Sequence, residues 1–402
     1  MEHKHTIRIL FLTILAEVIG LGILIPIVPL LFTEPSSQFF MLGSGSITLG
    51  YILLGLTVGL YPLAQFFSTP ILGELSDIYG RKRVIQLSVI GTIAATLIFA
   101  FGILKGSVAV LLASRALNGA TGGLISVAQA TIADVSEQNS KSKNFGIIGA
   151  AFGTGFIIGP FLGGVLSSDL YPFLNPATPF FFAASLSALS LLYVSLKLRE
   201  TSPMEKSSIN WKKPFSQVVK GLKLPGLKKL FGTSFFYFAG FAFYTTFLPV
   251  YLIKRFGFSQ FQVGNTYLYL GVFILLTQLV IVPRLFKRCR ETRVMPLTLF
   301  LTGFFILSLI LAPEKVIFFG LLAFFAVNNS ISMVSIQTLI SNKAPEKDQG
   351  LALGTNRSVR AMATAFPAML SGFAAALSNP GIPLVIAGSI IMATALIYSS
   401  IR

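Results

Sequence analysis

The chain has 402 residues, of which 54% are hydrophobic and 11% are charged, whereas a soluble domain carries about 25% charged residues. This composition excludes a soluble enzyme and indicates a polytopic membrane protein. The net charge of +17 would suggest nucleic acid in a soluble protein, but here the basic residues fall in short loops between apolar runs, so we expect no nucleic-acid partner.

Twelve apolar runs are each long enough to cross a bilayer, which takes about 20 residues. Continuous runs of this length also argue against a transmembrane barrel, whose strands show only weak alternation. The sequence therefore predicts an all-α integral membrane protein with 12 transmembrane helices. The predicted helices cover approximately residues 7–32, 47–72, 84–104, 107–133, 145–168, 177–197, 227–253, 260–284, 294–312, 315–340, 351–376 and 380–401.

Lysine and arginine predict the orientation of these helices. If the N-terminus is cytoplasmic, four of the 31 Lys and Arg lie in outside loops, Arg115 lies within a helix, and the remaining 26 lie in inside loops and tails. Because Lys and Arg accumulate on the cytoplasmic side, we expect both termini in the cytoplasm and the protein in the inner or plasma membrane. The four outside residues are Lys105, Lys254, Arg255 and Lys315.

A polar segment, residues 198–226, divides the twelve runs six and six. It holds five lysines and three prolines, and we expect a cytoplasmic linker with an interfacial helix anchored by Trp211. The predicted domains are an N-terminal six-helix bundle, residues 1–197, this linker, and a C-terminal six-helix bundle, residues 227–402. Loops after the fourth and tenth runs are weakly similar, which favours two pseudo-symmetric halves with a site between them.

A short basic turn between the second and third runs has the most specific pattern in the chain. It reads Gly73-Glu-Leu-Ser-Asp77-Ile-Tyr-Gly80-Arg81-Lys-Arg. The two glycines give the backbone freedom to turn, and the aspartate can accept hydrogen bonds from a neighbouring helix start. The pattern G-x-L-x-D-x-x-G-R-[KR]-[KR] resembles the signature loop of the major facilitator superfamily of secondary transporters. An ordinary basic cytoplasmic turn is the alternative.

The resemblance implies the major facilitator fold and two contacts of this loop. One joins Arg81 to Asp134, at the cytoplasmic end of the fourth run. The other places Asp77 at the positive N-terminus of the eleventh run, near Gly350, where a carboxylate is stabilised by about 0.3–1 kcal/mol. These contacts would hold the halves together on the inside and stabilise an outward-open state. A solvated turn is the alternative.

Glu17 is the one acid that we place deep in a predicted membrane helix. It lies about ten residues past the cytoplasmic end, or about 15 Å at 1.5 Å per residue. An ionised carboxylate is costly there, so we expect Glu17 to take up protons near neutral pH and to exchange them for substrate. A permanent structural pair with an arginine is the alternative. The pattern acid-x-x-G-x-G-x-x-x-P-x-x-P, which begins at Glu17, resembles the first helix of tetracycline and multidrug proton antiporters.

Arg115 lies about eight residues into the fourth run, where an arginine requires a partner or a water-filled cavity. The spacing R-x-x-x-G, which ends at Gly119, resembles the fourth-helix motif of the superfamily, in which the arginine is linked to proton transfer. The resemblance implies a pair of Arg115 with Glu17 that breaks on protonation. The alternative is that Arg115 only connects helix ends through backbone carbonyls.

The fifth run carries glycines at four-residue spacing, which form a flat strip for close approach of another helix. Its pattern G-x-x-x-G-P-x-x-G-G resembles the antiporter motif of the superfamily, which symporters generally lack, and favours export by antiport. Close packing alone explains any single glycine. The motif residues are Gly155, Gly159, Pro160, Gly163 and Gly164.

Polar side chains within apolar runs are candidates for a substrate cavity. Such groups hydrogen-bond a ligand or bond across helices as packing contacts. The second half offers several, but it has no acid at the bilayer centre. The candidates are Asn118, Tyr244, Gln278, Asn328 and Asn329.

The resemblance covers nearly the whole chain and is strongest to the 12-helix drug:proton antiporters of the tetracycline-efflux type. It implies a monomeric, non-enzymatic antiporter in the lipid bilayer that exports amphipathic small molecules in exchange for protons, without a cofactor or metal. Ala95 stands where tetracycline carriers place an acid in the third helix, which argues against tetracycline itself. A metabolite symporter or facilitator and a non-transporting membrane sensor are the alternatives.

Overall fold

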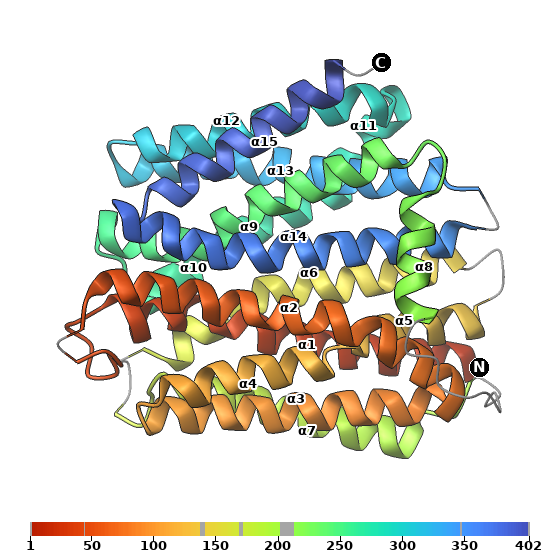
Figure 1. Ribbon diagram of the computed structural model, residues 1–402, viewed down its shortest axis with the longest axis horizontal. Coiled ribbons are helices and arrows are strands. Elements are labelled where there is room, and N and C mark those ends of the chain that lie inside the picture. The colour runs from red at the N-terminus through yellow and green to blue at the C-terminus, as the bar shows by residue number, and fades with distance from the viewer. Residues whose placement is uncertain are drawn as a thin grey trace. The chain divides into compact units, whose positions relative to one another are not determined.

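The computed structural model describes residues 2–43, 45–136, 141–168, 172–201, 213–345 and 348–400. All regular elements in these ranges are helices (Figure 1). They are α1 (Glu2–Thr33), α2 (Ile47–Tyr79), α3 (Arg81–Leu104), α4 (Val108–Thr121), α5 (Leu124–Val135), α6 (Lys141–Leu166), α7 (Thr178–Lys197), α8 (Lys213–Leu222), α9 (Lys228–Phe256), α10 (Gln260–Leu276), the π-helix η1 (Thr277–Ile281), α11 (Val282–Arg288), α12 (Glu291–Leu311), α13 (Lys315–Lys343), α14 (Gln349–Leu377) and α15 (Ile382–Ser400).

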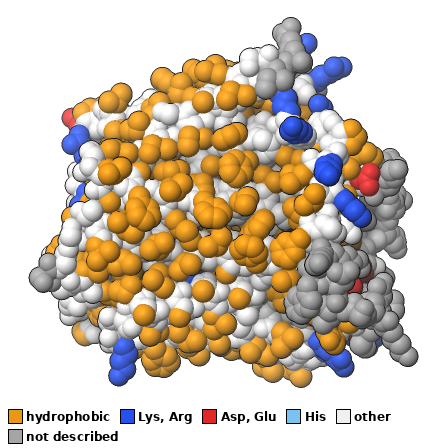
Figure 2. Space-filling model, in the orientation of Figure 1, with side chains coloured by type: hydrophobic (Ala, Val, Ile, Leu, Met, Phe, Trp, Pro, Cys, Tyr) orange, Lys and Arg blue, Asp and Glu red, His pale blue; other side chains and the backbone are white. Residues whose placement is uncertain are grey.

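Within the described ranges, 12 helical stretches are long and apolar enough to cross a membrane, which confirms the predicted number. Two of them combine shorter helices: α4 with α5, as Val108–Val135, and α10, η1 and α11, as Gln260–Arg288. Figure 2 shows hydrophobic side chains over the middle of the helices and Lys and Arg side chains toward their ends. That distribution is the one a bilayer requires of helices that cross it.

The fourth predicted run is one span but two helices, because Gly122 and Gly123 separate α4 from α5. Such a break leaves backbone carbonyls without their helical partners, which is unfavourable inside a membrane unless other groups bond them. Two polar side chains of α2 supply those bonds. Gln65 donates from Nε2 to the Gly122 carbonyl at 2.8 Å, and Ser68 donates to the Gly119 carbonyl at 2.7 Å.

The chain divides into two compact units. Unit 1 comprises Met1–Gly43, Leu60–Pro214 and Ser259–Leu268, and unit 2 comprises Ser44–Gly59, Phe215–Phe258 and Tyr269–Arg402. Each unit therefore holds most of one predicted half together with a short segment from the other half. The six-plus-six domain division stays a prediction.

In unit 1, α1 is the central helix, and it packs against α6, α7 and α5. α3 lies beside α7 and α4, as Figure 1 also shows. The apolar core between them is built from aliphatic side chains of α1, α3, α5, α6 and α7. Its largest buried members are Ile9, Leu10, Ile14, Ile85, Leu124, Ile132, Ile148 and Leu198.

In unit 2, α9 is buried along most of its length and packs against α14 and α15. α12 packs against both α13 and α15, and its contact with α15 is close because glycines meet there. A Cβ on Gly303 would lie 2.5 Å from the carbonyl oxygen of Gly388. The predicted interfacial helix in the linker corresponds to α8, whereas its predicted anchor, Trp211, lies outside the described residues.

Candidate functional site

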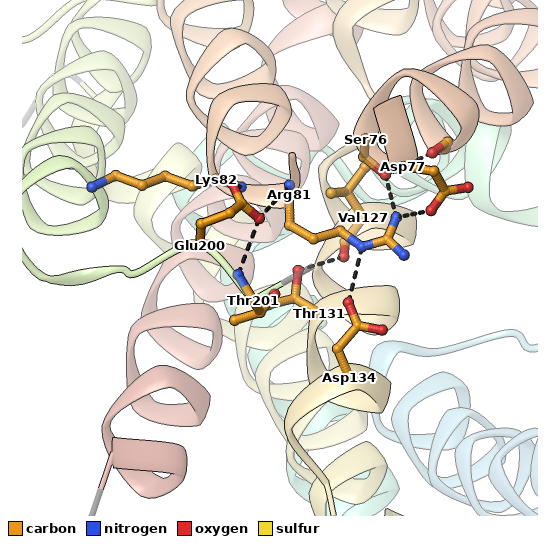
Figure 3. A network of polar contacts seen from close by, with 10 residues as sticks. Ser76, Asp77, Arg81, Lys82, Val127, Thr131, Asp134, Glu200 and Thr201 are labelled. Atoms are coloured by element: carbon orange, nitrogen blue, oxygen red, sulfur yellow. Dashed lines mark hydrogen bonds and ion pairs between the residues drawn. The ribbon is translucent and has the colours of Figure 1, made fainter. Parts of the chain in front are cut away.

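The turn between α2 and α3 is made by Gly80, whose φ of 95° is a conformation that favours glycine. This turn places Arg81 at the first position of α3, and its guanidinium contacts both acids of the predicted loop network (Figure 3). It forms an ion pair with Asp77, and Nε donates to Asp134 Oδ2 at 3.0 Å. Arg81 is 9% exposed, whereas the side chain of Asp77 is 48% exposed, so the network extends from a buried arginine to the surface.

A carboxylate that the sequence analysis missed completes this network. Glu200, which follows α7, accepts hydrogen bonds from the backbone N–H groups of Arg81 at 2.8 Å and Lys82 at 3.2 Å (Figure 3). Since Gly80 has no side chain to cap α3, Glu200 satisfies the free N–H groups and places negative charge at the positive helix end. No local sequence pattern points to it, because 119 residues separate Glu200 from Arg81.

The glycines of the loop are not equivalent. A Cβ on Gly80 would lie 2.8 Å from Cδ of Glu200, so this position is restricted by both its φ and the cap. A Cβ on Gly73 would meet no atom within 4 Å. The structure therefore explains why Gly80 is a glycine but shows no packing reason for Gly73.

Glu17 lies in the middle of α1 and is 4% exposed. Arg115 of α4 is 6% exposed, and the two charges lie close enough to act on each other. Thr92 of α3 lies beside the carboxyl of Glu17. The structure thus brings the predicted acid and the predicted base into one buried cluster of unit 1.

An aromatic ring of α2 is the third member of this cluster. The Cζ atom of Arg115 lies 4.9 Å from the centroid of the Tyr61 ring, and Gln65 donates to the Tyr61 hydroxyl at 3.0 Å. A cation above an aromatic face is stabilised most strongly where water is excluded. Sequence spacing alone could not identify Tyr61, because it lies on a different helix from either charge. Asn118, one turn after Arg115, is 8% exposed and belongs to the same face of α4.

The glycine strip of α6 packs mainly against α1, the helix that carries Glu17. A Cβ on Gly159 would lie 2.7 Å from the Ile19 carbonyl oxygen and 2.9 Å from Cα of Gly22. Gly155 and Gly163 make equally close approaches to α1, whereas Gly164 faces α10. Pro160 lies within α6, and its Cδ would be 2.8 Å from a Cβ on Gly22.

The candidate cavity residues of unit 2 fall into different environments. Tyr244 is 1% exposed, and its ring lies 4.5 Å from that of Phe325. Asn329 is 4% exposed and accepts a 2.7 Å hydrogen bond at Oδ1 from the hydroxyl of Tyr237. Asn328, only half-buried, donates to a carbonyl of its own helix.

Gln278 is separate from these groups. It lies in η1 at an exposed position, and it makes no side-chain hydrogen bond within the ranges that the structure describes. A π-helical turn is uncommon and is frequently found at functional sites, but here its neighbours Leu279 and Val280 are also exposed. We therefore leave Gln278 out of the site.

Two arginines require a correction to the sequence analysis, which counted them among the cytoplasmic loops and tails. Arg357 and Arg360 lie within α14, eight and eleven positions after its first residue, Gln349. At 1.5 Å per residue they lie about 12 Å and 16 Å along the helix. The predicted run at residues 351–376 already contains both arginines, so the count of basic residues in cytoplasmic loops should have excluded them.

Comparison with known proteins gives the family. The profile of the Major Facilitator Superfamily matches residues 10–368. A tetracycline resistance protein of class H from Pasteurella multocida is 34% identical over 203 residues, which cover 50% of this chain and 46% of that protein. Multidrug resistance protein 1 of Bacillus subtilis (strain 168) is 27% identical over 382 residues, which cover 92% of this chain and 90% of that protein.

The matches to the tetracycline resistance proteins of classes H, E, C and B cover only 44–48% of each relative. A crystal structure of the human organic anion transporter MFSD10 (TETRAN) superposes with a TM-score of 0.73 at 20% identity. That superposition covers 99% of this chain and 100% of the human chain, and it shows a shared fold. Because the profile covers most of the chain and the fold agrees, this protein belongs to the Major Facilitator Superfamily of membrane transporters.

Proposed function

We propose that this protein is a proton-coupled antiporter that exports amphipathic small molecules such as drugs. The observation that carries the proposal is the cluster around Glu17. An acid that is 4% exposed in the middle of an apolar helix is expensive to ionise, and the nearby charge of Arg115 offsets part of that cost. Such a carboxyl can bind a proton in one state of the transport cycle and release it in another.

The exchange of a proton for a substrate requires that protonation of Glu17 and substrate binding exclude each other. When Glu17 is ionised, it attracts Arg115. When it is protonated, that attraction is lost and Arg115 is released. The names of the relatives, tetracycline resistance and multidrug resistance proteins, support export of drug-like compounds. The position at which tetracycline carriers have an acid is Ala95 in this chain, and it is fully buried in α3. We therefore do not propose tetracycline as the substrate.

The glycine strip supports antiport rather than symport. Gly159 and its neighbours let α6 approach α1, the helix that carries Glu17, at backbone distance. A smooth contact of this kind permits two helices to slide without separating. Asn118, Tyr244 and Asn329 are the residues that we propose for substrate contacts, and the proposed protein acts as a monomer.

The loop around Arg81 would act as the conformational switch. Its contacts with Asp77 and Asp134 tie the ends of α2, α3 and α5 together. We propose cytoplasmic termini and two six-helix halves joined by residues 198–226. Cysteines introduced at Gly43 and Ser208, with Cys289 replaced by serine, test this orientation, because only the first should be labelled from outside intact cells.

The decisive experiment is transport into inverted membrane vesicles with an imposed pH gradient, screened over a panel of amphipathic cations, anions and neutral compounds. We expect at least one compound to accumulate inside the vesicles and to leak out when the gradient is dissipated. Transport that ignores the gradient would identify a facilitator. Uptake that requires the reversed gradient, with protons flowing into the vesicles, would identify a symporter.

A further inference from the structure

The membrane-spanning part of unit 2 contains positive charge without a matching acid. Arg357 and Arg360 are half-buried in α14, and Leu377, the last residue of that helix, lies 17 positions beyond Arg360. The acids of unit 2 within the described ranges are Glu291, Glu314 and Asp348, and each precedes or begins a helix. An arginine at membrane depth is rare and normally faces a partner or a water-filled cavity.

The two guanidinium groups share one region of the helix. They are three positions apart, so they lie on neighbouring points of one face of α14, and their charges repel each other. Neither arginine forms an ion pair within the ranges that the structure describes. Bringing two like charges together in a low-dielectric region is unfavourable unless an anion joins them.

Phe238 and Tyr237 of α9 form an aromatic wall beside Arg360, and Asn329 of α13 bonds to that wall. The Cζ atom of Arg360 lies 4.1 Å from the centroid of the Phe238 ring. Tyr237, the adjacent residue, binds Asn329 through its hydroxyl, and because Oδ1 of that amide is the acceptor, its Nδ2 remains a potential donor. Next to Arg357, Asn356 is 4% exposed, and its Oδ1 has no hydrogen-bond partner in the described residues.

A row of aromatic rings extends from this wall. Tyr237 stacks on Phe241 with ring centroids 6.1 Å apart, and Phe241 stacks on Tyr244 at the same separation. Phe325 of α13 continues the row, 4.5 Å from Tyr244. Tyr237, Tyr244 and Phe325 are fully buried, whereas the ring of Phe241 between the two tyrosines is half-buried. Positive charge beside a partly exposed ring is complementary to a molecule with an anionic group and a planar apolar body.

We propose that Arg357 and Arg360 bind the anionic group of the exported compound, and that Phe241 contacts its ring system. The substrate class is therefore aromatic organic anions, with a carboxylate or sulfonate head. A planar carboxylate can accept parallel hydrogen bonds from a guanidinium, which gives orientation as well as affinity. This inference rests on the proposed export function and adds the substrate class to it.

The test compares two dyes with the same xanthene ring system but opposite charge. The purified full chain, in phosphatidylcholine nanodiscs, is titrated with the anion fluorescein and with the cation rhodamine 123 while fluorescence anisotropy is measured. The variants are Arg360→Gln and Arg357→Gln, with Arg293→Gln as the control, because Arg293 is an exposed basic residue of unit 2. We expect the fluorescein Kd to rise at least about tenfold in either site variant and to stay unchanged in the control.

Rhodamine 123 must not lose affinity in the site variants, since removal of positive charge cannot weaken binding of a cation through electrostatics. Arg360→Lys retains the charge but not the planar fork, and we expect an intermediate fluorescein Kd. This variant also serves if Arg360→Gln does not fold. Equal fluorescein affinity in the native protein and in folded Arg357→Gln and Arg360→Gln overturns the inference.

Two further measurements separate this inference from its alternatives. If added phosphatidylglycerol displaces fluorescein, the arginines hold a lipid headgroup and the substrate assignment is wrong. Export of fluorescein into inverted vesicles is measured in parallel. If dye binding depends on charge but fluorescein is not exported in response to the gradient, the proposed antiport is wrong and the anion site stands. If other compounds are exported in response to the gradient but dye binding does not depend on charge, only the anion site is wrong.

Discussion

The two charged centres within the membrane-spanning helices differ in charge balance. In unit 1, Glu17 and Arg115 come from different helices and carry opposite charges that act on each other. In unit 2, Arg357 and Arg360 come from one helix and carry the same charge. An acid and a base can compensate each other inside a low-dielectric site, whereas two bases leave uncompensated positive charge.

Because of this difference, we expect one centre to couple protons and the other to bind the ligand. A centre whose charge is balanced by an internal partner can change its charge by one proton without a ligand, as coupling requires. A centre with an excess of positive charge is suited to a ligand that brings the negative charge with it. We therefore expect substitutions in unit 1 to alter the response to a pH gradient and substitutions at the arginines of unit 2 to alter which compounds bind.

The largest effect should come from Glu17→Gln, which makes the centre of unit 1 an unbalanced cation like that of unit 2. One pH unit supplies about 1.4 kcal/mol per proton, which is enough for about tenfold accumulation of substrate. The variant should lose all of this gradient-driven accumulation. Accumulation in inverted vesicles with and without the gradient measures the loss. Glu314→Gln, at an exposed carboxyl before α13, is the control and should retain full accumulation.

Downhill exchange of a neutral substrate should survive in Glu17→Gln, because only the proton site is removed. Glu17→Asp should keep part of the gradient-driven activity, since the acid remains on a shorter side chain. If Glu17→Gln still concentrates substrate in response to the gradient, the balanced centre is not the coupling site. In that case Asp77 and Asp134 become the next candidates.

The next effect tests how the balanced centre is held. Gly159→Leu should abolish transport while the protein still inserts, because a side chain at this position meets the backbone of α1 at Ile19 and Gly22. Gly149→Leu is the matched control on the same helix, since a Cβ there meets no atom within 4 Å. Transport rates and amounts of each variant in purified membranes are compared. Normal transport by Gly159→Leu would show that the α1–α6 contact is not needed.

A smaller effect should follow from removing the cap on α3. Glu200→Gln loses the charge that bonds the N–H groups of Arg81 and Lys82, which should lower the free energy of unfolding by about 1 kcal/mol. For a unit of this size the expected decrease in Tm is about 2–4 °C. Thermal unfolding of the purified protein measures it. Glu314→Gln is again the control, because Glu314 precedes α13 without a side-chain cap bond.

The smallest effect should come from Asp77→Asn. The Asp77 side chain is 48% exposed, and an exposed ion pair with Arg81 is worth about 0.2–1 kcal/mol. The variant should slow transport by up to about fivefold and leave substrate affinity unchanged, because Asp77 biases conformational states rather than touching the ligand. Rates and binding constants are measured on the same preparation. A large loss of affinity with an unchanged rate would contradict this role.

Several features of the protein follow from the sequence alone. The twelve spans are readable because each residue in a bilayer must be apolar enough by itself, so composition over about 20 residues carries the signal. Glu17 is identifiable for the same reason, as an acid within such a run. The basic turn near Arg81 is identifiable because its residues lie within a dozen positions of one another. The superfamily follows from these local patterns.

Contacts between distant segments were decided by the tertiary structure. Glu200 caps α3 from a position 119 residues away, and Tyr61 stacks under Arg115 from another helix. Arg357 and Arg360 show the same limit: the predicted run at residues 351–376 contains both, yet the count of basic residues assigned their charges to cytoplasmic loops. Only packing against α9, where Arg360 meets Phe238, shows that these charges belong to the protein interior. Hydropathy adds contributions residue by residue, whereas the energy of a buried charge depends on what other helices place beside it.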